Sequence, residues 1–254
     1  MSAPGPAPAA RGDGQASVPE GLVSAVVNLV NTGPVLLGAY TIAELTAVDA
    51  VVDFLETRPS DEVLAEAVRS LAARQLLVAG AAGEQVRVQG DLGIAVAFQQ
   101  RARAVLDARV TGTEPGEPWR ILLLPQPEKI CLQFSIDALG IHQVGLYQLD
   151  EALSALARWL PQGHQADPGG PVDVDDLLAT ADRAALLTVT RYTTEGSAET
   201  AENTTDLVLA RKHDRLHVLA RDPADRTRLI PSPQDGREIP DRLTELLFAG
   251  RARP

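Results

Sequence analysis

A series of short apolar runs that occurs twice constrains the fold of this chain most strongly. The first series has apolar runs at 104–110, 119–125, 130–136 and 141–147, closed by a helical pattern at 150–160. The second has runs at 185–191, 205–211, 215–221 and 226–232, closed by a helical pattern at 237–247. Runs of this length and composition are typical of β-strands. The sequence therefore predicts two β-β-β-β-α units, which correspond in element order and strand length rather than in residue identities.

The two units predict an α+β fold with one shared core. Either unit alone would leave one face of its sheet bare, so we expect a pseudo-two-fold duplicated body around a central antiparallel sheet. Helices flank this sheet and are expected against one of its faces. The expected organisation is a disordered tail (1–19), an N-terminal half (20–161), a Gly/Pro-rich linker (162–171) and a C-terminal half (172–254). Helical patterns at 91–102 and 172–183 lead into the two units.

The strand runs differ in how they distribute apolar residues. WRILLLP (119–125) is apolar throughout, which favours burial on both sheet faces, whereas ICLQFSI (130–136) alternates. The stretch 193–205 is polar and acidic and has no large apolar residue, so we interpret it as a mobile hairpin loop.

The region before the first unit has clear helix signals. Residues 21–31 are Val-rich, which leaves helix and strand both open. Thr41 and Glu44 form a capping-box pattern, which predicts a helix over 42–56. Ser60 is placed to cap the next helix, and a Gly-Ala turn then leads to a short strand at 84–88.

Two helices followed by a β-turn also fit a winged-helix regulator, here at residues 41–88. Its recognition helix would present Arg69 and Arg74 against Asp61, Glu62 and Glu66, a charge balance poorly suited to the major groove. The whole chain has a formal net charge of −11 and a pI of about 4.8. Nucleic acid and anionic membranes attract Lys- and Arg-rich surfaces, so neither is an expected partner.

Features of compartment and membrane are few. Cys131 is the one cysteine, lies inside an apolar run and fits a reducing compartment. The longest apolar stretch, Leu22 to Leu45, is interrupted by Asn28, Asn31, Gly33 and Pro34, so membrane insertion is not expected. The first residues lack the pattern of a signal peptide, and we expect a cytoplasmic protein.

The sequence carries no recognisable constellation for catalysis, for a cofactor or for a metal. Phosphate-binding loops, nucleophile elbows and HExxH motifs are absent. His213 and His217 have the spacing of a metal pair only on a helix, and His142 follows a turn. Asp173, Asp175 and Asp176 fit a helix N-terminus better than a calcium loop. Ser135 has no evident His and Asp partners. We therefore expect no enzyme activity.

The order of these elements resembles the EspG-like family, the cytosolic secretion-associated chaperones of actinobacterial ESX (type VII) systems. The resemblance covers roughly residues 40–250. It is carried by IAELTAVDAVVDFL, LAEAVRSLAARQLLV and DLGIAVAFQQRARAVLDARV, by the strands WRILLLP, ICLQFSI and GIHQVGLYQL, by DEALSALARWL, and by the second-half partners ending in IPDRLTELL.

The resemblance implies a non-enzymatic chaperone or adaptor that binds a helical secreted protein, of the PE–PPE or WXG type, and keeps it soluble. No short binding motif of the family can be placed here, so no partner-binding residue is assigned. Two other hypotheses remain: a winged-helix transcriptional regulator using residues 41–88, and a structural protein that self-associates through its sheet. The client and the oligomeric state remain open.

Overall fold

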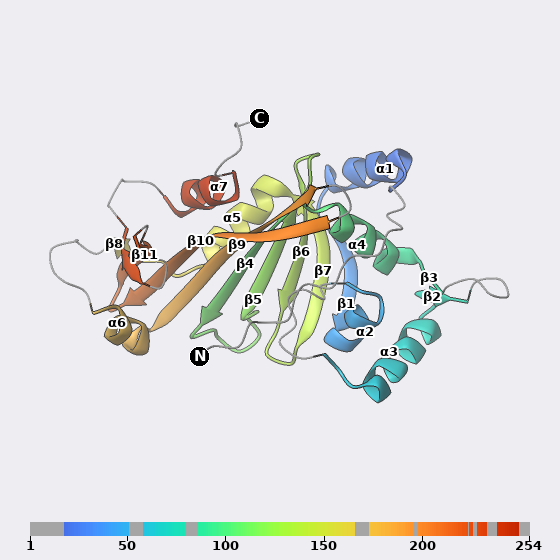
Figure 1. Cartoon of the computed structure of the whole chain (residues 1–254), viewed down its shortest axis with the longest axis horizontal. Helices are drawn as coiled ribbons and strands as arrows, with labels where there is room; N and C mark the ends of the chain where they lie inside the picture. Colours follow the sequence, from blue (N-terminus) through green and yellow to red (C-terminus); the bar gives the residue numbers. More distant parts are fainter. Residues whose placement is uncertain are drawn as a thin grey trace.

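The computed structural model describes residues 18–50, 58–79, 86–165, 173–195, 198–222, 224–225, 228–232 and 238–248. Over these residues the chain is an α+β fold in which helices flank a ten-stranded sheet (Figure 1). This confirms the predicted fold class at the level of a central antiparallel sheet with flanking helices. The predicted disordered tail lies outside the described residues, apart from its last two positions.

Nine strands form one continuous antiparallel path, and the short β8 (His164–Gln165) pairs with β11 in parallel. Their order across the sheet is β1 (Val35–Thr41), β7 (Ile141–Gln148), β6 (Ile130–Ile136), β5 (Arg120–Pro125), β4 (Ala104–Thr111), β9 (Arg183–Glu195), β10 (Ala198–Lys212), β11 (Arg215–Arg221) and β12 (Leu229–Pro231).

The strand order runs outward from the centre in both directions. β4 and β9 pair with each other, β4 to β7 then lead to one edge, and β9 to β12 lead to the other. Each series ends in a helix, α5 (Leu149–Trp159) after the first and α7 (Ile239–Phe248) after the second. β1 adds one more strand to the first series, beside β7. The two sheet edges are therefore β1 and β12.

The stretch 193–205, which was predicted to be a hairpin loop, continues two paired β-strands. β9 extends to Glu195, β10 starts at Ala198, and their backbones pair from Arg183↔Arg211 out to Glu195↔Ala198. The prediction of a hairpin at 193–205 was therefore right in its connection but wrong in its loop, because the described residues of this stretch are paired strand. Backbone hydrogen bonds need no apolar side chains, and the many threonines in this stretch favour extended backbone.

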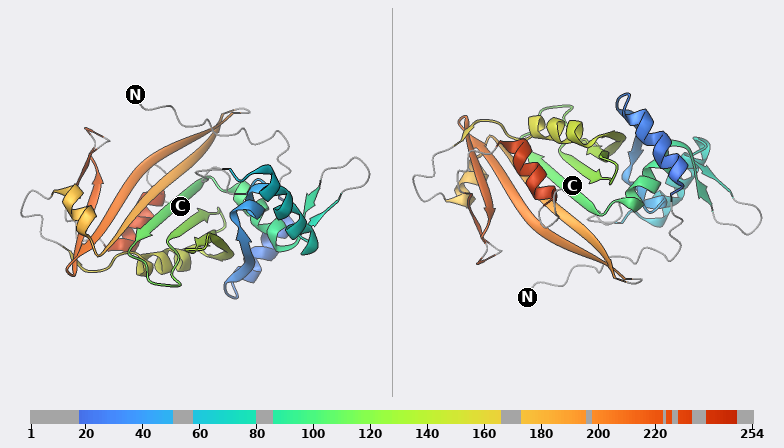
Figure 2. Two further views of the ribbon diagram at one scale, coloured as in Figure 1. Left: turned by 90° about the horizontal axis from the view of Figure 1, so that it is seen from below. Right: turned by 90° about the horizontal axis from the view of Figure 1, so that it is seen from above.

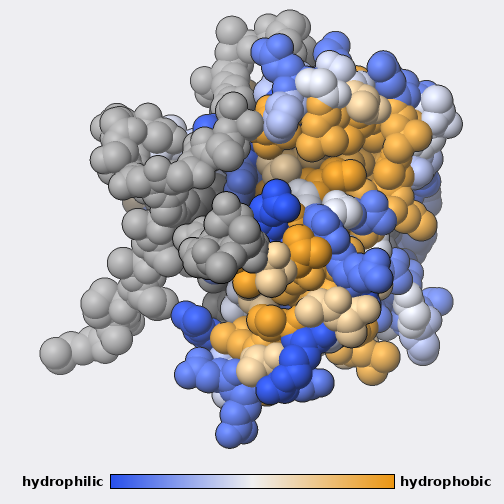
Figure 3. Space-filling view, turned by 90° about the vertical axis from the view of Figure 1, so that its right-hand side faces the viewer, coloured by the Kyte–Doolittle hydropathy of each residue, from blue (hydrophilic) through white to orange (hydrophobic). Residues whose placement is uncertain are grey.

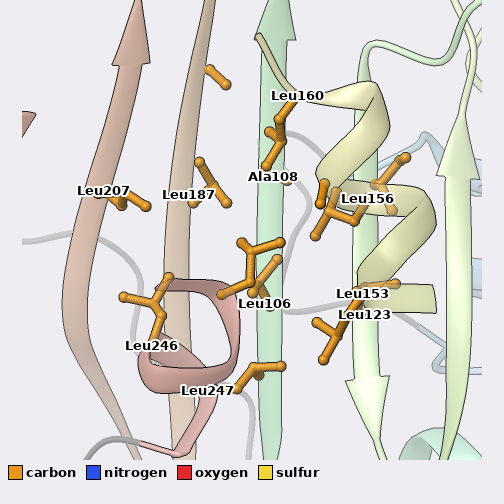
Figure 4. Close-up of a cluster of buried hydrophobic side chains, with 14 of the residues drawn as sticks. Leu106, Ala108, Leu123, Leu153, Leu156, Leu160, Leu187, Leu207, Leu246 and Leu247 are labelled. Atoms are coloured by element: carbon orange, nitrogen blue, oxygen red, sulfur yellow. The ribbon is translucent and has the colours of Figure 1, made fainter. Parts of the chain in front are cut away.

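Helices cover both faces of the sheet, which corrects the expectation of one covered face. On one face, α5 and α7 lie over strands of both series, and their leucines meet in a single cluster (Figure 4). We call this cluster the α5–α7 core; it contains Leu106, Leu123, Leu156, Leu187 and Leu246. Because strands from both halves contribute residues to this core, neither half alone could shield it from water.

The other face is covered by helices at opposite ends of the sheet (Figure 2). α1 (Glu20–Val30), α2 (Ile42–Ala47), α3 (Asp61–Ala73) and α4 (Gly90–Arg101) contribute to a second cluster with Leu122, Phe134 and Val144. α6 (Val174–Thr180) packs on Val208 and Leu219 at the far end. Helices on both faces follow from β5, where Leu122 and Leu124 enter one core and Ile121 and Leu123 the other. The part of WRILLLP that forms β5 is thus buried on both faces, as predicted, while Trp119 before it is 37% exposed.

The helix predicted over 42–56 ends early within the described residues, and positions 51–56 of the prediction lie outside them. α2 starts with the expected capping box of Thr41 and Glu44 but ends at Ala47. Asp49 has a positive φ of 52°, and the backbone N–H of Ala50 donates to the carbonyl of Leu45. This is the Schellman arrangement that ends helices, formed here without glycine. The region continues with α3, capped by Ser60 as predicted, and a small hairpin of β2 (Leu77–Val78) and β3 (Arg87–Val88).

Gly112 and Arg183 fix the junction of the two series. A Cβ at Gly112 would lie 2.4 Å from the carbonyl oxygen of Asp182, so only glycine lets the two segments approach this closely. The Arg183 guanidinium donates to Glu117 (2.8 Å) and to the carbonyl of Trp159 at the end of α5 (2.9 Å). The hydrogen bond from Arg183 lowers the pKa of Glu117.

A buried ion pair lies near the centre of the sheet. Asp107 of β4 accepts from the Nε and Nη2 atoms of Arg120 of β5 at 2.9 and 2.8 Å, and from Nε of Arg109 at 3.1 Å. Asp107 and Arg120 are both buried. Two parallel hydrogen bonds fix the planes of both groups and connect the side chains of β4 and β5.

Candidate protein-binding surface

The segment that forms α1 and β1 differs from the rest of the chain in charge. Residues 21–43 contain no Asp, Glu, Lys, Arg or His, whereas 22% of the whole chain is charged. A helix and an edge strand at the surface of a soluble protein normally expose charged side chains. An uncharged stretch of this length at the surface is therefore unusual.

One side of α1 packs inward and the other faces outward. Val23, Val26 and Val30 are buried at helical spacing. The outward side presents Ser24, Ala25, Asn28 and Leu29, all exposed. Leu29 keeps 53% of its side-chain surface accessible. The outer side of α1 is therefore flat and neutral, with one large apolar side chain near its C-terminal end.

β1 follows α1 along the chain and exposes a second large apolar side chain at the edge of the sheet. Leu36 is 74% exposed. Leu37 beside it is buried in the hydrophobic cluster to which α1, α2, α3 and α4 contribute. Figure 3 faces this end and shows apolar residues gathered over its upper part, where Figure 1 places α1. We call Ser24, Ala25, Asn28, Leu29 and Leu36 the α1–β1 surface.

The backbone edge of β1 is protected against pairing with a further strand. The register of β1 on β7 shifts between Leu36 and Gly38, which leaves Leu37 as a β-bulge. The Tyr40 ring folds back over Gly38, and its hydroxyl donates to the carbonyl of Leu37 at 2.7 Å. Burial raises the pKa of Tyr40, so the hydroxyl stays a donor. A bulged strand twists away from a would-be partner strand.

Arg74 of α3 closes the same edge from the side. Its Nη2 donates to the Ala39 carbonyl at 3.4 Å, and its guanidinium lies 5.1 Å from the centre of the Tyr40 ring. Nη1 donates at 3.1 Å to Glu44, whose carboxylate also accepts from Ser70 (2.8 Å) and the backbone of Thr41 (2.9 Å). Glu44, the first charge after the neutral segment, therefore points into the protein and leaves the α1–β1 surface neutral.

The winged-helix region shows both of its candidate DNA-reading arginines engaged with carboxylates. Arg69 pairs with Glu66 on the surface of α3 at 2.5 Å, and Arg74 pairs with Glu44. The exposed Arg69–Glu66 pair is weak, whereas Arg74 is held by the buried Glu44 carboxylate and is less available to a phosphate. DNA binding through residues 41–88 stays a hypothesis, and these contacts do not favour it.

The structure does not bring the four histidines together. His142 is buried in β7, with Nδ1 3.0 Å from the Gly140 carbonyl, while His164, His213 and His217 lie near the opposite edge. His164 is 3.8 Å from Asp214, and both are exposed. In the described part of the chain no three His, Cys, Asp or Glu residues group as a metal site would require. Asp173 caps α6, accepting from the backbones of Asp175 and Asp176 at 3.1 Å, as its position predicted.

Cys131 and Ser135 lie on the sheet, among side chains that do not activate them. Cys131 is fully buried, and burial raises its pKa to about 12, so the thiolate is not formed at neutral pH. Ser135 accepts a hydrogen bond from Gln133 at 2.9 Å.

Comparison with protein-family models and with curated proteins finds no match for this chain. Among the described residues, none of the helices combines the length and the hydropathy that crossing a bilayer requires.

Sequence reasoning missed the α1–β1 surface. It treated residues 21–31 only as a Val-rich segment of uncertain secondary structure. The available signal was the absence of charge over residues 21–43, but an uncharged run also describes a buried strand. Only the exposure of Leu29 and Leu36 in the structure distinguishes an uncharged surface from a buried strand.

Proposed function

We propose that this protein is a non-enzymatic cytosolic chaperone or adaptor that binds a helical segment of a secreted protein on its α1–β1 surface. The observation that carries the proposal is the exposure of Leu29 (53%) and Leu36 (74%) within a segment free of charge. Complete burial of a fully exposed leucine side chain is worth about 1.5–3 kcal/mol, and Leu29 and Leu36 can gain the fraction of this that corresponds to their exposed surface. A partner that covers them recovers this free energy.

The expected occupant is the apolar stripe of an amphipathic helix. An extended segment would have to add to β1, and the bulge at Leu37, the Tyr40 ring and Arg74 oppose that. A helix needs no backbone hydrogen bonds from its receptor. Ser24 and Ala25 on the outer side of α1 are small enough to let a second helix approach closely, with Leu29 packing beside it.

The resemblance to the EspG-like family supports the same proposal from the arrangement of the fold. We interpret the outward strand order from β4 and β9, and the closing helices α5 and α7, as two duplicated units related by a pseudo-two-fold axis. Members of that family have two related halves on a central antiparallel sheet and bind the helical tip of a PE–PPE heterodimer. We therefore place the client among secreted helical proteins of a type VII system.

The test compares three forms of the full chain as bait in its native cytosol, with captured proteins identified by mass spectrometry. The forms are the wild type, Leu29→Asp/Leu36→Asp, and Leu139→Asp as the matched control. Leu139 is 86% exposed on the turn before β7 and lies outside the α1–β1 surface. A partner held by the surface is retained by the wild type and by the control and is lost by the double variant.

The captured partner is then purified and its affinity measured against all three forms. Loss of two apolar contacts predicts at least about 100-fold weaker binding by the double variant, because each 1.4 kcal/mol is a factor of ten. Circular dichroism of the partner must show a helical protein. A partner that binds the double variant as tightly as the wild type overturns the proposal.

Self-association through the same surface is the competing outcome. Light scattering of the purified wild type distinguishes the two, since a dimer that the double variant converts to a monomer assigns the surface to a second copy of this chain. That result would replace the chaperone proposal with the structural, self-associating one.

A further inference from the structure

A groove of about 500 Å³ lies on the sheet face that carries α5 and α7. Its walls are the C-terminal half of α5 and the start of α7, and β11 forms its floor. It shares no residue with the α1–β1 surface. The volume is within the range of pockets that hold small ligands or peptide ends.

The floor and inner walls of the groove are apolar. Leu216 and Val218 of β11 belong to the α5–α7 core and are more than nine-tenths buried. Ala157 on α5 and Ile239 and Pro240 on α7 complete the apolar part. A large aliphatic side chain placed here would extend an existing core.

The rim of the groove carries two guanidinium groups. Arg158 lies in the last turn of α5, and within the described residues it has no ion-pair partner. Arg242 lies in α7, where its Nη1 donates to the Ser232 hydroxyl at 3.4 Å. Glu238 is the one carboxylate among the lining residues that the structure describes. In a chain with a net charge of −11, two arginines around one apolar groove favour an anionic ligand.

The carbonyl groups at the end of α5 would repel an anion if they were bare, but side chains already bind them. Gln162 donates through Nε2 to the carbonyls of Ala157 (2.6 Å) and Leu160 (2.9 Å). Arg183 donates to the carbonyl of Trp159 at 2.9 Å. Three carbonyl groups at the negative end of the α5 dipole therefore already accept hydrogen bonds, and the charged groups that line the groove are Arg158, Arg242 and Glu238.

We propose that this groove binds the C-terminal end of a peptide. The terminal carboxylate pairs with Arg158 and Arg242, and the last side chain, a large aliphatic one, packs against Ile239 and Pro240 above the floor of Leu216 and Val218. A guanidinium presents several N–H donors to a carboxylate, and the capture of a terminal carboxylate beside an apolar pocket is a recurrent mode of peptide recognition. This inference stands apart from the proposed function, because it uses other residues on other elements.

The probe is a short fluorescein-labelled peptide that ends in two leucines with a free carboxylate, titrated with the full chain by fluorescence anisotropy. The matched ligands are the same peptide as a C-terminal amide and the same peptide ending in two glycines. Removing a hydrogen-bonded charge predicts about tenfold or weaker binding of the amide, and loss of the apolar contact predicts a similar decrease for the glycine peptide.

The protein variants are Arg158→Ala and Arg242→Ala, with Arg69→Ala as the control. Arg69 is an exposed arginine of α3 at the far end of the molecule. The two groove variants should bind the carboxylate peptide about tenfold more weakly and the amide no more weakly than the wild type does. The control should match the wild type, and the Leu29→Asp/Leu36→Asp variant should also retain peptide binding.

Three results would overturn the inference. They are equal affinity for acid and amide, no binding of the acid peptide at millimolar concentration, and an equal loss in Arg158→Ala and Arg69→Ala. Displacement of the peptide by N-acetyl-leucine with the same affinity as the peptide would assign the groove to a small carboxylic acid instead. Because the double variant of the α1–β1 surface is included, failure here is distinguishable from failure of the proposed function.

Discussion

The two edges of the sheet are both protected against strand addition, but by different means. β12 is three residues long, contains Pro231 and is followed in the sequence by mainly polar residues. β1 has seven residues, a bulge, a ring folded over Gly38 and an arginine on its backbone. A short strand with proline and nearby charges is a sufficient defence. Protection of an edge therefore does not require the neutral, apolar surface found beside β1.

An edge strand can be protected against strand addition, and it can also present an uncharged surface. The contrast between β12 and β1 shows that the first does not require the second. Around β12, Arg221, Asp222 and Arg228 keep the surface charged. Around β1 the same protection is achieved by buried groups, Tyr40 and Glu44 with Arg74, and the outer side chains stay uncharged. Protection by buried groups leaves the surface itself available for a partner, which is the physical content of the proposed function.

The largest expected change in stability comes from Gly38→Ala. Gly38 has a φ of +123°, and a Cβ there would lie 2.9 Å from the Tyr40 hydroxyl. The backbone strain alone predicts a loss of about 1–3 kcal/mol in the free energy of unfolding, and displacement of Tyr40 adds to it.

The control for Gly38→Ala is Gly33→Ala. Gly33 has a φ of +147° and no atom within 4 Å of its would-be Cβ, so it reports backbone strain alone. Urea unfolding of both variants isolates the contribution of the Tyr40 ring. Equal losses in the two variants would mean that the ring does not hold the bulge.

The second prediction concerns Arg74, which closes the β1 edge. Arg74→Ala removes a hydrogen bond from the buried carboxylate of Glu44, which predicts a loss of about 1–2 kcal/mol because Arg74 itself is partly exposed. Arg69→Ala removes an exposed pair with Glu66 and should change stability by less than about 0.5 kcal/mol. Arg74→Ala also frees the Ala39 carbonyl on the β1 edge, so copies of this variant should self-associate as the protein concentration rises. Identical unfolding curves for the two variants would contradict this role.

A segment of this chain could be predicted from sequence when its side chains are buried in a regular pattern. The strands of both series could be predicted because their apolar runs enter cores on one or both faces, as Leu122 and Leu123 do. Their long-range order, with β4 beside β9, depends on pairing that no local pattern encodes. A hairpin was predicted at 193–205, but the extension of β9 and β10 into it was missed because backbone pairing there leaves no apolar signature.

The β1 edge could be predicted only in part. The capping box of Thr41 and Glu44 was readable, but the helix end at Ala47 was not, since Asp49 adopts a left-handed conformation without the glycine that usually signals it. Burial of Glu44 depends on Ser70 and Arg74, which lie on another helix. The candidate surface depended on exposure, and sequence alone does not separate an exposed apolar residue from a buried one.

The third prediction uses one histidine near each edge. Burial lowers the pKa of His142, which pairs with Tyr40 across β7 and β1, and also that of His217 on β11. Between the ordinary value of 6.5 and the lowered pKa, the unfolded chain binds a proton that the folded chain does not. Stability should therefore fall as the pH falls below about 6.5.

The two histidines should contribute unequally. His142 is 4% exposed, whereas His217 is only partly buried, so His142→Gln should flatten the pH dependence more than His217→Gln does. Urea unfolding at pH 7.5 and pH 5.5 measures both. If both histidines contributed equally to the pH dependence of stability, His142 near β1 would be no more shielded from water than His217 near β12.

The smallest effect is expected at β12, from Pro231→Val. Proline lacks the backbone N–H that an edge strand would offer to a partner, and Pro231 pairs with Leu219 on β11. Valine restores that donor, yet the strand remains three residues long, so its stability should change by less than about 1 kcal/mol. Sedimentation should show at most weak self-association. Binding of the proposed helical partner should not change, because β12 lies at the opposite edge of the sheet from β1. A Pro231→Val chain that forms stable dimers would show that one proline, rather than strand length and nearby charge, protects β12, and the two edges would then differ less than their surfaces indicate.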